Sequence, residues 1–224
     1  MEKKNNLNAL SSQTITTKIK ICGLMRESDI IAVNRSHPDF AGFVFAKSKR
    51  QITLAQAAAF RSLLDHSIPA IGVFVNEDPE KILDICNAGI IQWIQLHGQE
   101  SEETIQYLKA RLKQSKQSCP IIKAVSVQTA QDIRLAETLS CDYLLLDHGS
   151  GGTGQSFDWS SIPHISKPFF LAGGLNQTNI KTARHYHAYC LDVSSGAETN
   201  GKKDAEKIHS LVEAVHGCIS DTVM

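Results

Sequence analysis

Two residues of this sequence could act together as a general acid and a general base. Cys22 ends the apolar run Lys18–Cys22, and Asp147 ends the apolar run Asp142–Asp147. A cysteine can serve as a base when a nearby positive field lowers its thiol pKa from about 8.5 toward neutrality, whereas apolar surroundings can keep an aspartic acid protonated. A thiolate and a carboxylic acid that face one another would form a pair with opposite pKa tuning. The structural alternatives are a buried core thiol at Cys22 and a turn-capping carboxylate at Asp147.

Glycine-rich turns follow the last three apolar runs of the sequence and could bind an anion. They are Gly151, Gly152, Thr153 and Gly154 after the run that ends at Asp147, then Gly173 and Gly174 after Pro168–Ala172, and finally Ser194, Ser195 and Gly196 after Tyr189–Val193. Because glycine has no Cβ, its backbone N–H can approach an anion closely. A single turn of this kind could equally serve only to reverse the chain. Three neighbouring turns that share the pattern favour a phosphate site.

Two further polar residues also follow apolar runs. Arg50 lies in the segment Ser48–Arg50 after the run Phe40–Phe45, and His97 directly follows the run Ile91–Leu96. The planar guanidinium of Arg50 could bind a carboxylate through two hydrogen bonds at the rim of a pocket, although an exposed arginine is usually a solvated surface charge. His97 could line the pocket or be a hydrogen-bonded structural histidine.

Eight short apolar runs must position these residues. They are Lys18–Cys22, Phe40–Phe45, Ala70–Val75, Ile91–Leu96, Pro120–Val125, Asp142–Asp147, Pro168–Ala172 and Tyr189–Val193. Most are nearly continuous rather than alternating, which is typical of parallel strands buried on both faces. Helical patterns lie between them, and eight strand–helix units favour a closed α/β barrel of the (β/α)8 type over a large doubly wound sheet. The active site of such a barrel forms where the strands end, which is where the candidate residues lie.

Several helices can be delimited from the residues at their ends. Thr53 and Gln56 form a capping box ahead of a segment rich in Ala and Leu. Asp78, followed by a proline, predicts the start of another helix, and Gly89 stands where that helix should end. Further helices are expected to start at Ser101 and to cover Asp204–Val215, with a short one around Asp158–Ile162.

The composition limits the classes of protein to which the chain can belong. It has 224 residues, with 23 Lys plus Arg and 23 Asp plus Glu. A net charge near zero argues against nucleic-acid binding, which needs a concentrated basic surface. No stretch approaches the length of a membrane span, and the polar residues 1–17 lack the apolar run of a signal peptide. We therefore expect a cytoplasmic protein that has a flexible leader over residues 1–17, a single catalytic domain over residues 18–224, and no contact with membranes.

The cysteines do not indicate a metal site or a disulfide framework. The six are at positions 22, 86, 119, 141, 190 and 218, and none belongs to a CxxC pair. A zinc site would need clustered ligands, which the sequence does not offer. Most of the cysteines are therefore expected to be small core residues in a reducing compartment.

The polar residues at the ends of the runs occur in stretches that together resemble the phosphoribosylanthranilate isomerase family. The stretches are Lys20–Leu24 (KICGL), Phe45–Arg50, Gln95–Gly98 (QLHG), Leu146–Gly154, Leu171–Leu175 (LAGGL) and Leu191–Glu198 (LDVSSGAE), followed by Gly201 and Lys203-Asp204. KICG alone would be a weak signal, whereas the ordered set covers almost the whole chain from Lys18 and is highly specific. The resemblance implies a barrel enzyme that uses neither a metal nor an organic cofactor. It leaves both a monomer and a homodimer open.

The activity implied by the resemblance is an Amadori rearrangement in tryptophan biosynthesis, which converts N-(5-phosphoribosyl)anthranilate to 1-(o-carboxyphenylamino)-1-deoxyribulose 5-phosphate. The family's general base maps to Cys22, its general acid maps to Asp147, and Arg50 would hold the anthranilate carboxylate. His97 and Asp192 match pocket positions of the family, without an assigned role. The phosphate of this small-molecule substrate would lie against the glycine-rich turns, near Gly154, Gly174 and Ser195.

The chain departs from the family pattern in two places. The family often has Ser-Pro-Arg in the segment where this chain has Ser48-Lys49-Arg50, so the backbone could hold Arg50 more loosely. The leader over residues 1–17 has no recognised counterpart in the family.

Related phosphosugar enzymes are the nearest alternatives. The aminoaldose isomerase of histidine biosynthesis would be expected to carry a carboxylate in place of Cys22. Indoleglycerol-phosphate synthase would be expected to carry a lysine at a central pocket position and a helical N-terminal extension. A catalytically silent barrel that binds a phosphorylated metabolite or a partner protein is a third alternative, and the presence of both Cys22 and Asp147 argues against it.

Overall fold

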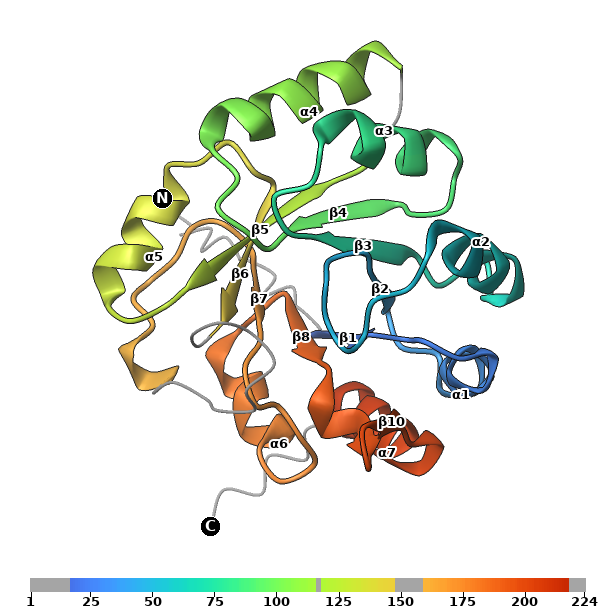
Figure 1. The fold of residues 1–224 in the computed structure, drawn as a ribbon. Helices are drawn as coiled ribbons and strands as arrows, with labels where there is room; N and C mark the ends of the chain where they lie inside the picture. Colours follow the sequence, from blue (N-terminus) through green and yellow to red (C-terminus); the bar gives the residue numbers. More distant parts are fainter. Residues whose placement is uncertain (1–16, 116–117, 148–158, 218–224) are drawn as a thin grey trace, which may run out of the picture.

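The computed structural model describes residues 17–115, 118–147 and 159–217, and eight of its strands form a closed barrel. These strands are β1 (Lys18–Cys22), β2 (Phe40–Val44), β3 (Ala70–Phe74), β4 (Trp93–Leu96), β5 (Ile121–Ser126), β6 (Tyr143–Asp147), β7 (Phe169–Leu171) and β8 (Cys190–Val193). They pair in parallel in chain order, and β8 pairs with β1 to close the barrel. Figure 1 looks into this barrel, with the strands at its centre and the helices around it. The predicted (β/α)8 architecture is confirmed.

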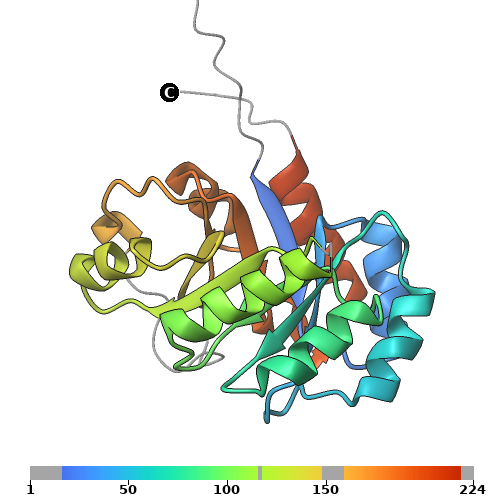
Figure 2. The ribbon, with the colours of Figure 1, turned by 90° about the horizontal axis from the view of Figure 1, so that it is seen from above.

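Helices connect successive strands along the outside of the barrel. They are α1 (Glu27–Ser36), α2 (Leu54–Leu63), α3 (Pro79–Asn87), α4 (Glu102–Gln114), α5 (Ala130–Glu137), α6 (Ile180–Ala183) and α7 (Ala205–His216), with short 3-10 turns at η1 (Trp159–Ser161), η2 (Arg184–Tyr186) and η3 (Ser195–Ala197). A small hairpin of β9 (Glu198–Thr199) and β10 (Lys202–Lys203) precedes α7. Figure 2 shows the last helix, α7, lying beside the first strand, β1. The helix expected around Asp158–Ile162 is only the 3-10 turn η1 within the described residues.

The helix starts follow the predicted signals. The Thr53 hydroxyl accepts a hydrogen bond from the Gln56 backbone N–H at 3.2 Å, and the Gln56 side chain accepts one from the Thr53 N–H at 2.8 Å. Asp78 likewise caps α3, which ends at Asn87. Gly89 then adopts a φ of 70°, which a residue with a side chain rarely tolerates. These helix ends could be predicted from the sequence because each signal involves residues only a few positions apart.

Side chains alternate between the inside and the outside of the barrel along each strand, since the strand period is two residues. The outward-facing apolar side chains pack against the helices and form the larger core. Inside, a second cluster of Phe40, Ile71, Ile122, Leu145, Phe170 and Cys190 fills the end of the barrel where the strands begin, and Trp93, Tyr143 and Tyr189 pack against it. The rings of Phe40 and Trp93 lie 4.9 Å apart, and those of Tyr143 and Tyr189 lie 4.7 Å apart. This aromatic floor leaves the opposite end of the barrel for polar side chains.

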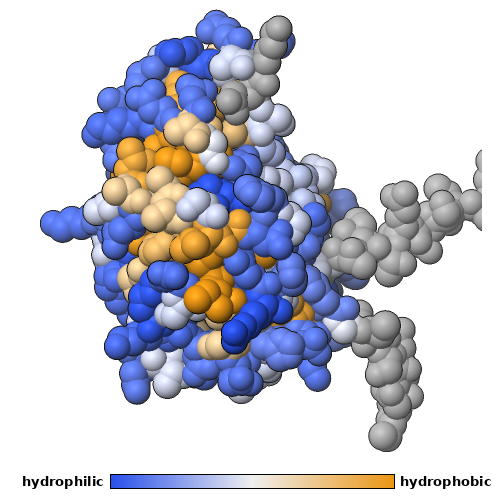
Figure 3. Space-filling model, turned by 90° about the vertical axis from the view of Figure 1, so that its right-hand side faces the viewer, coloured by the Kyte–Doolittle hydropathy of each residue, from blue (hydrophilic) through white to orange (hydrophobic). Residues whose placement is uncertain are grey.

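Apolar side chains also gather on one outer side of the molecule. Figure 3 shows this side, which carries α1 and α2 in Figure 1. Ile31 of α1 is 46% exposed, and Leu54 and Leu63 of α2 are 52% and 48% exposed. None of the helices among the described residues is both long and apolar enough to cross a membrane. The predicted leader, residues 1–17, lies outside the described residues except for Thr17.

The capping box of α2 yields a stability prediction. We expect Thr53→Ala to lower the free energy of unfolding by about 0.5–2 kcal/mol, because the Gln56 N–H loses its acceptor. For a domain of this size each kcal/mol shifts Tm by roughly 2–4 °C, which circular dichroism can measure. Thr53→Ser keeps the hydroxyl and should retain most of the stability. Equal Tm values for all three proteins would show that the cap contributes nothing.

Candidate active site

The barrel brings the candidate acid and base to the same open end. Cys22 is the last residue of β1, and Asp147 is the last residue of β6. In the closed barrel, β7 and β8 separate these two strands on one side. Counting back in steps of two from either residue reaches the interior positions Lys20 and Leu145, so both side chains belong to the inner face of the barrel.

The Cys22 thiol lies deep in the mouth of the barrel, with only 8% of the residue exposed. Burial raises the pKa of the thiol, the positive charges of Lys20 and Lys203 act to lower it, and the negative charge of Asp192 acts to raise it further. The net direction is upward, so the lowered pKa that the sequence analysis named as the condition for a thiolate base is not found in the structure. The positive field is present, but burial outweighs it. Gly42 makes room for the thiol, because a Cβ there would lie 2.8 Å from the Cys22 Sγ.

A polar layer crosses the barrel between the aromatic floor and its mouth. Lys20 is fully buried, and its ammonium donates to Asp192 Oδ2 at 2.9 Å and to Gln95 Oε1 at 2.6 Å. Burial acts to lower the pKa of Lys20, but the charges of Asp192 and Cys22 raise it above its ordinary value, so the side chain remains an ammonium. Lys20 and Gln95 lie within the motifs KICGL and QLHG, which did not indicate a role for either residue. The available signal was their position two residues before Cys22 and His97, which places each on the inner face of its strand.

Asp147 lies close to His97 at the mouth of the barrel. The Nε2 of His97 is 3.6 Å from Asp147 Oδ2, and its Nδ1 is 2.8 Å from Gln95 Nε2. The His97 side chain is 26% exposed and that of Asp147 is 9% exposed. The structure thus brings His97 together with the candidate acid at the ends of β4 and β6.

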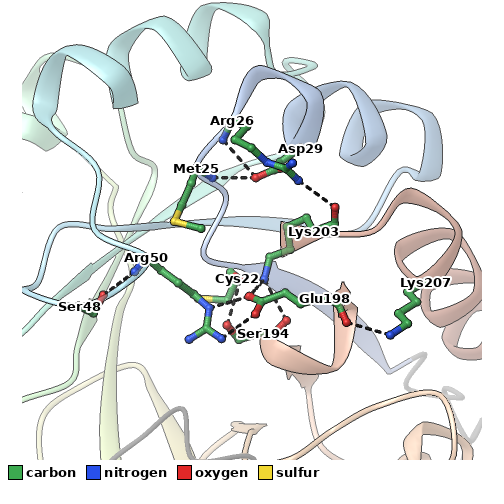
Figure 4. Close-up of polar contacts among 10 residues, drawn as sticks. All are labelled: Cys22, Met25, Arg26, Asp29, Ser48, Arg50, Ser194, Glu198, Lys203 and Lys207. Atoms are coloured by element: carbon green, nitrogen blue, oxygen red, sulfur yellow. Dashed lines mark hydrogen bonds and ion pairs between the residues drawn. The ribbon is translucent and has the colours of Figure 1, made fainter. Parts of the chain in front are cut away.

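Arg50 is more buried than an arginine at a pocket rim would be, with 8% of the residue exposed. Its Nε donates to Glu198 Oε1 at 2.6 Å and its Nη2 donates to Glu198 Oε2 at 3.0 Å (Figure 4). The Arg50 backbone N–H also donates to the Ser48 hydroxyl at 3.1 Å. The loosening expected from Lys49 in place of proline is therefore countered by contacts that hold Arg50 at both its backbone and its side chain.

Glu198, the partner of Arg50, lies on the hairpin that precedes α7 and is itself held by Lys203 of the same hairpin. Lys203 Nζ donates to Glu198 Oε1 at 2.7 Å and to the Ser194 carbonyl at 2.9 Å (Figure 4). Burial acts to raise the pKa of Glu198, but hydrogen bonds from Arg50 and Lys203 lower it to about 2. Burial lowers the pKa of Lys203, although Glu198 opposes this. Neither residue received a role from the sequence, because the partners Arg50 and Glu198 are 148 positions apart.

The described glycine-rich turns meet at the ends of β7 and β8. Gly173 and Gly174 have φ values of 89° and 66°, conformations that favour glycine. A Cβ on Gly196 would lie 1.9 Å from the Leu175 carbonyl oxygen, so only glycine lets the two turns touch. Ser194 donates its hydroxyl to the Cys22 carbonyl at 3.2 Å, and Ser195 begins the 3-10 turn η3. The predicted phosphate residues Gly152 and Gly154 lie outside the described residues.

No cluster of three or more His, Cys, Asp or Glu side chains suited to a metal ion occurs in the described part of the chain. Cys22, Cys86, Cys119, Cys141 and Cys190 are all buried and free. The residues at the mouth offer proton transfer and anion binding: a thiol beside an ammonium, a carboxyl beside an imidazole, and a guanidinium held by a carboxylate.

Most of the chain matches a known protein family and individual members of it. The model of the family described as N-(5'phosphoribosyl)anthranilate (PRA) isomerase matches residues 19–214. An N-(5'-phosphoribosyl)anthranilate isomerase from Endomicrobium trichonymphae is 46% identical over 201 residues, which are 88% of this chain and 96% of that protein. The relative of that name from Lacticaseibacillus casei is 44% identical over 196 residues, covering 87% of this chain and 92% of the other.

Solved structures show the same relationship. The phosphoribosyl anthranilate isomerase of Thermotoga maritima superposes with a TM-score of 0.78 and 33% identity, covering 90% of this chain and 100% of the other. A phosphoribosyl anthranilate isomerase in complex with reduced 1-(o-carboxyphenylamino)-1-deoxyribulose 5-phosphate gives a TM-score of 0.75 and 32% identity over 90% of this chain and 100% of that chain.

The low pKa of Glu198 yields a prediction about acid stability. A carboxyl group whose pKa falls from 4.5 to about 2 on folding stabilises the protein above pH 4.5, and this stabilisation is lost as the pH falls toward 2. Relative to the natural protein, we expect Glu198→Gln to be destabilised most at neutral pH and progressively less in acid. Urea unfolding of both proteins from neutral pH down to about pH 3 measures the difference. A difference that does not vary with pH would contradict this assignment.

Proposed function

Because this chain belongs to the N-(5'-phosphoribosyl)anthranilate isomerase family, aldose–ketose isomerases of tryptophan biosynthesis, we propose that Cys22 and Asp147 catalyse the rearrangement as general base and general acid. The observation that carries the proposal is their placement on the inner face at the ends of β1 and β6. Each has a different polar neighbour, since Lys20 lies near the thiol and His97 lies near the carboxyl. Two groups in unlike environments suit opposite proton-transfer roles.

The reaction requires two proton transfers at neighbouring parts of the sugar. Asp147 donates its proton to the furanose ring oxygen as the bond from that oxygen to C1 breaks, and the nitrogen lone pair forms an iminium with C1. Cys22 then takes the proton from C2, and the electron pair of that bond forms the double bond of the enolamine. The enolamine gains a proton at C1 and loses one from its C2 hydroxyl to become the ketone. The Cys22 thiolate ends this sequence with one proton more and Asp147 with one proton fewer.

The raised pKa of Cys22 fits this order of events. Burial favours the neutral thiol before reaction. An iminium formed next to the thiol adds a positive charge to those of Lys20 and Lys203, and a positive charge favours the thiolate. The same charge makes the C2 proton more acidic. In this mechanism the thiol releases its own proton to water once the ring has opened, and the thiolate that remains takes the proton from C2.

The carboxylate and the phosphate of the substrate are assigned to different parts of the mouth. Arg50 would hold the anthranilate carboxylate through the guanidinium edge that Glu198 does not occupy, since Glu198 takes Nε and one bond to Nη2. The phosphate would lie against the backbone N–H groups of the turns after β7 and β8, with the turn after β6. The residues in the latter assignment are Gly152, Gly154, Gly173, Gly174, Ser194, Ser195 and Gly196.

Substitution of the acid and the base separates catalysis from binding. We expect Cys22→Ser and Asp147→Asn each to lower kcat by about 10²–10⁴-fold with little change in KM, because each removes one proton transfer. Fluorescence of the anthranilate group during turnover of freshly made phosphoribosylanthranilate measures both constants. Cys141→Ser is the matched control, since Cys141 is also buried but precedes β6 at the other end of the barrel. Near-normal turnover of Cys22→Ser would remove Cys22 as the base.

Substitution of Arg50 should affect mainly substrate binding. Charge-assisted hydrogen bonds contribute about 1.5–3 kcal/mol each, so we expect Arg50→Ala to raise KM by roughly 10–100-fold with a smaller change in kcat. Arg50→Lys keeps the charge but loses the fork and should recover only part of the affinity. Unchanged steady-state kinetics for Arg50→Ala would remove Arg50 from the site.

A further inference from the structure

A continuous chain of polar side chains crosses the interior of the barrel and ends at the proposed acid. It runs from Asp192 on β8 to Lys20 on β1, then to Gln95 and His97 at β4, and finally to Asp147 on β6. The first three links are hydrogen bonds of 2.9 Å, 2.6 Å and 2.8 Å, and the last is an approach of His97 Nε2 to within 3.6 Å of Asp147 Oδ2. Lys20 is fully buried, Gln95 is 1% exposed, and the Asp192 side chain is 8% exposed. Side chains so deeply buried have few alternative partners.

The direction of each hydrogen bond in this chain is fixed by chemistry. A lysine ammonium has three donors and no acceptor, so Gln95 must turn its Oε1 toward Lys20. The amide of Gln95 therefore presents its Nε2, which can only donate, to His97 Nδ1. That nitrogen must accept the hydrogen bond and cannot itself carry a proton. A rotated amide would point its NH₂ group at the ammonium, which places two donors against each other.

The neutral imidazole of His97 is consequently left with its proton on Nε2, the nitrogen nearest Asp147. A doubly protonated ring would need a proton on Nδ1 as well, and this proton would face the Nε2 hydrogens of Gln95. The hydrogen-bond geometry thus disfavours the doubly protonated ring.

We propose that Lys20 and Gln95 are positioning residues that hold His97 as the neutral Nε2–H tautomer, so that Asp147 faces a neutral donor rather than a cation. This rests on the proposed role of Asp147 as the general acid. An imidazolium beside Asp147 would favour the ionised carboxylate, which has no proton to give. A neutral N–H does so less, and it can still donate to the carboxylate that forms when the proton leaves. The tautomer therefore serves Asp147 before and after the transfer.

Among the described residues, the other charged groups near His97 are already paired. Lys123 of β5 donates to Glu100 Oε2 and to the carbonyl of Gly98, the residue after His97, at 2.7 Å each. Asp192 reaches His97 only through Lys20, with which it forms an ion pair. Within the described part of the chain, Asp147 is thus the carboxyl group placed to respond to a change in the charge of His97.

Nitrogen NMR of the histidine rings tests the tautomer directly. Long-range proton–nitrogen correlation spectra of the ¹⁵N-labelled enzyme distinguish a protonated ring nitrogen from an unprotonated one, and His97→Gln identifies the His97 signals. We expect Nε2 of His97 to be protonated and Nδ1 to be unprotonated at the pH of the activity assay. A proton on Nδ1, alone or together with one on Nε2, would overturn the proposal. This measurement uses the natural enzyme and does not depend on any variant folding.

Gln95→Glu tests the link between Gln95 and the acid. The carboxylate has nearly the shape of the amide and can accept from both Lys20 and His97, so we expect a proton to appear on Nδ1. We also expect kcat to fall toward the roughly 10²–10⁴-fold loss of a missing general acid, with little change in KM. The basic limb of the kcat profile should move to lower pH, because a cationic His97 favours the ionised form of Asp147. An unchanged His97 spectrum in this variant would overturn the proposal.

Gln92→Glu is the matched control. Gln92 directly precedes β4, at the opposite end of the strand from His97, and its side chain contacts the backbone of Ala70 and Gly89. The Gln92→Glu substitution should leave both the His97 tautomer and kcat unchanged. A changed His97 tautomer in this variant would contradict the proposed path through Gln95. Failure of the underlying mechanism has a different signature. Normal turnover of Asp147→Asn would remove the acid assignment while leaving the His97 tautomer as expected.

Discussion

A lysine ammonium with no solvent exposure organises the interior of this barrel. A charge that is buried without partners costs far more than one that is paired and hydrogen-bonded. Lys20 therefore has to keep Asp192 and Gln95 against its ammonium, and the thiol of Cys22 lies in the remaining space beside it. Removing one member of a buried ion pair typically costs about 3–5 kcal/mol, because the other charge is left unpaired. The polar layer is thus as much a requirement of the fold as a part of the site.

A second set of paired charges lies at the mouth of the barrel. Glu198 lies between Arg50 and Lys203, so it fixes a loop that follows β2 against the hairpin that follows β8. Counting the two sets together, the cations are Lys20, Arg50 and Lys203, whereas the carboxylates are Asp192 and Glu198. The mouth therefore keeps one positive charge in excess among these residues. Such an excess suits a substrate that carries a carboxylate and a phosphate, and it opposes the burial that favours the neutral thiol.

The sequence predicted the barrel and the positions of Cys22 and Asp147 at strand ends, because both follow from local periodicity and from the geometry of parallel strands. It could not settle the direction of the Cys22 pKa, since the depth of burial depends on the packing of all eight strands. It also gave no role to Lys20, because a lysine within an apolar run shows no partner in its own segment. Contacts such as that between Arg50 and Glu198 join distant segments and become apparent only once the barrel is closed.

In the proposed reaction one charge contributes to both halves of the acid–base pair. The base benefits from a cation beside it, and Lys20 supplies that cation to Cys22. The acid must avoid a cation beside it. Lys20 donates to Gln95, and Gln95 donates to Nδ1 of His97, so the proton of His97 lies on the nitrogen that faces Asp147. An amide is suited to this position because its oxygen accepts from the ammonium while its nitrogen donates to the imidazole, and the amide itself remains neutral. A single buried ammonium and one oriented glutamine thus connect the surroundings of the proposed base to those of the proposed acid.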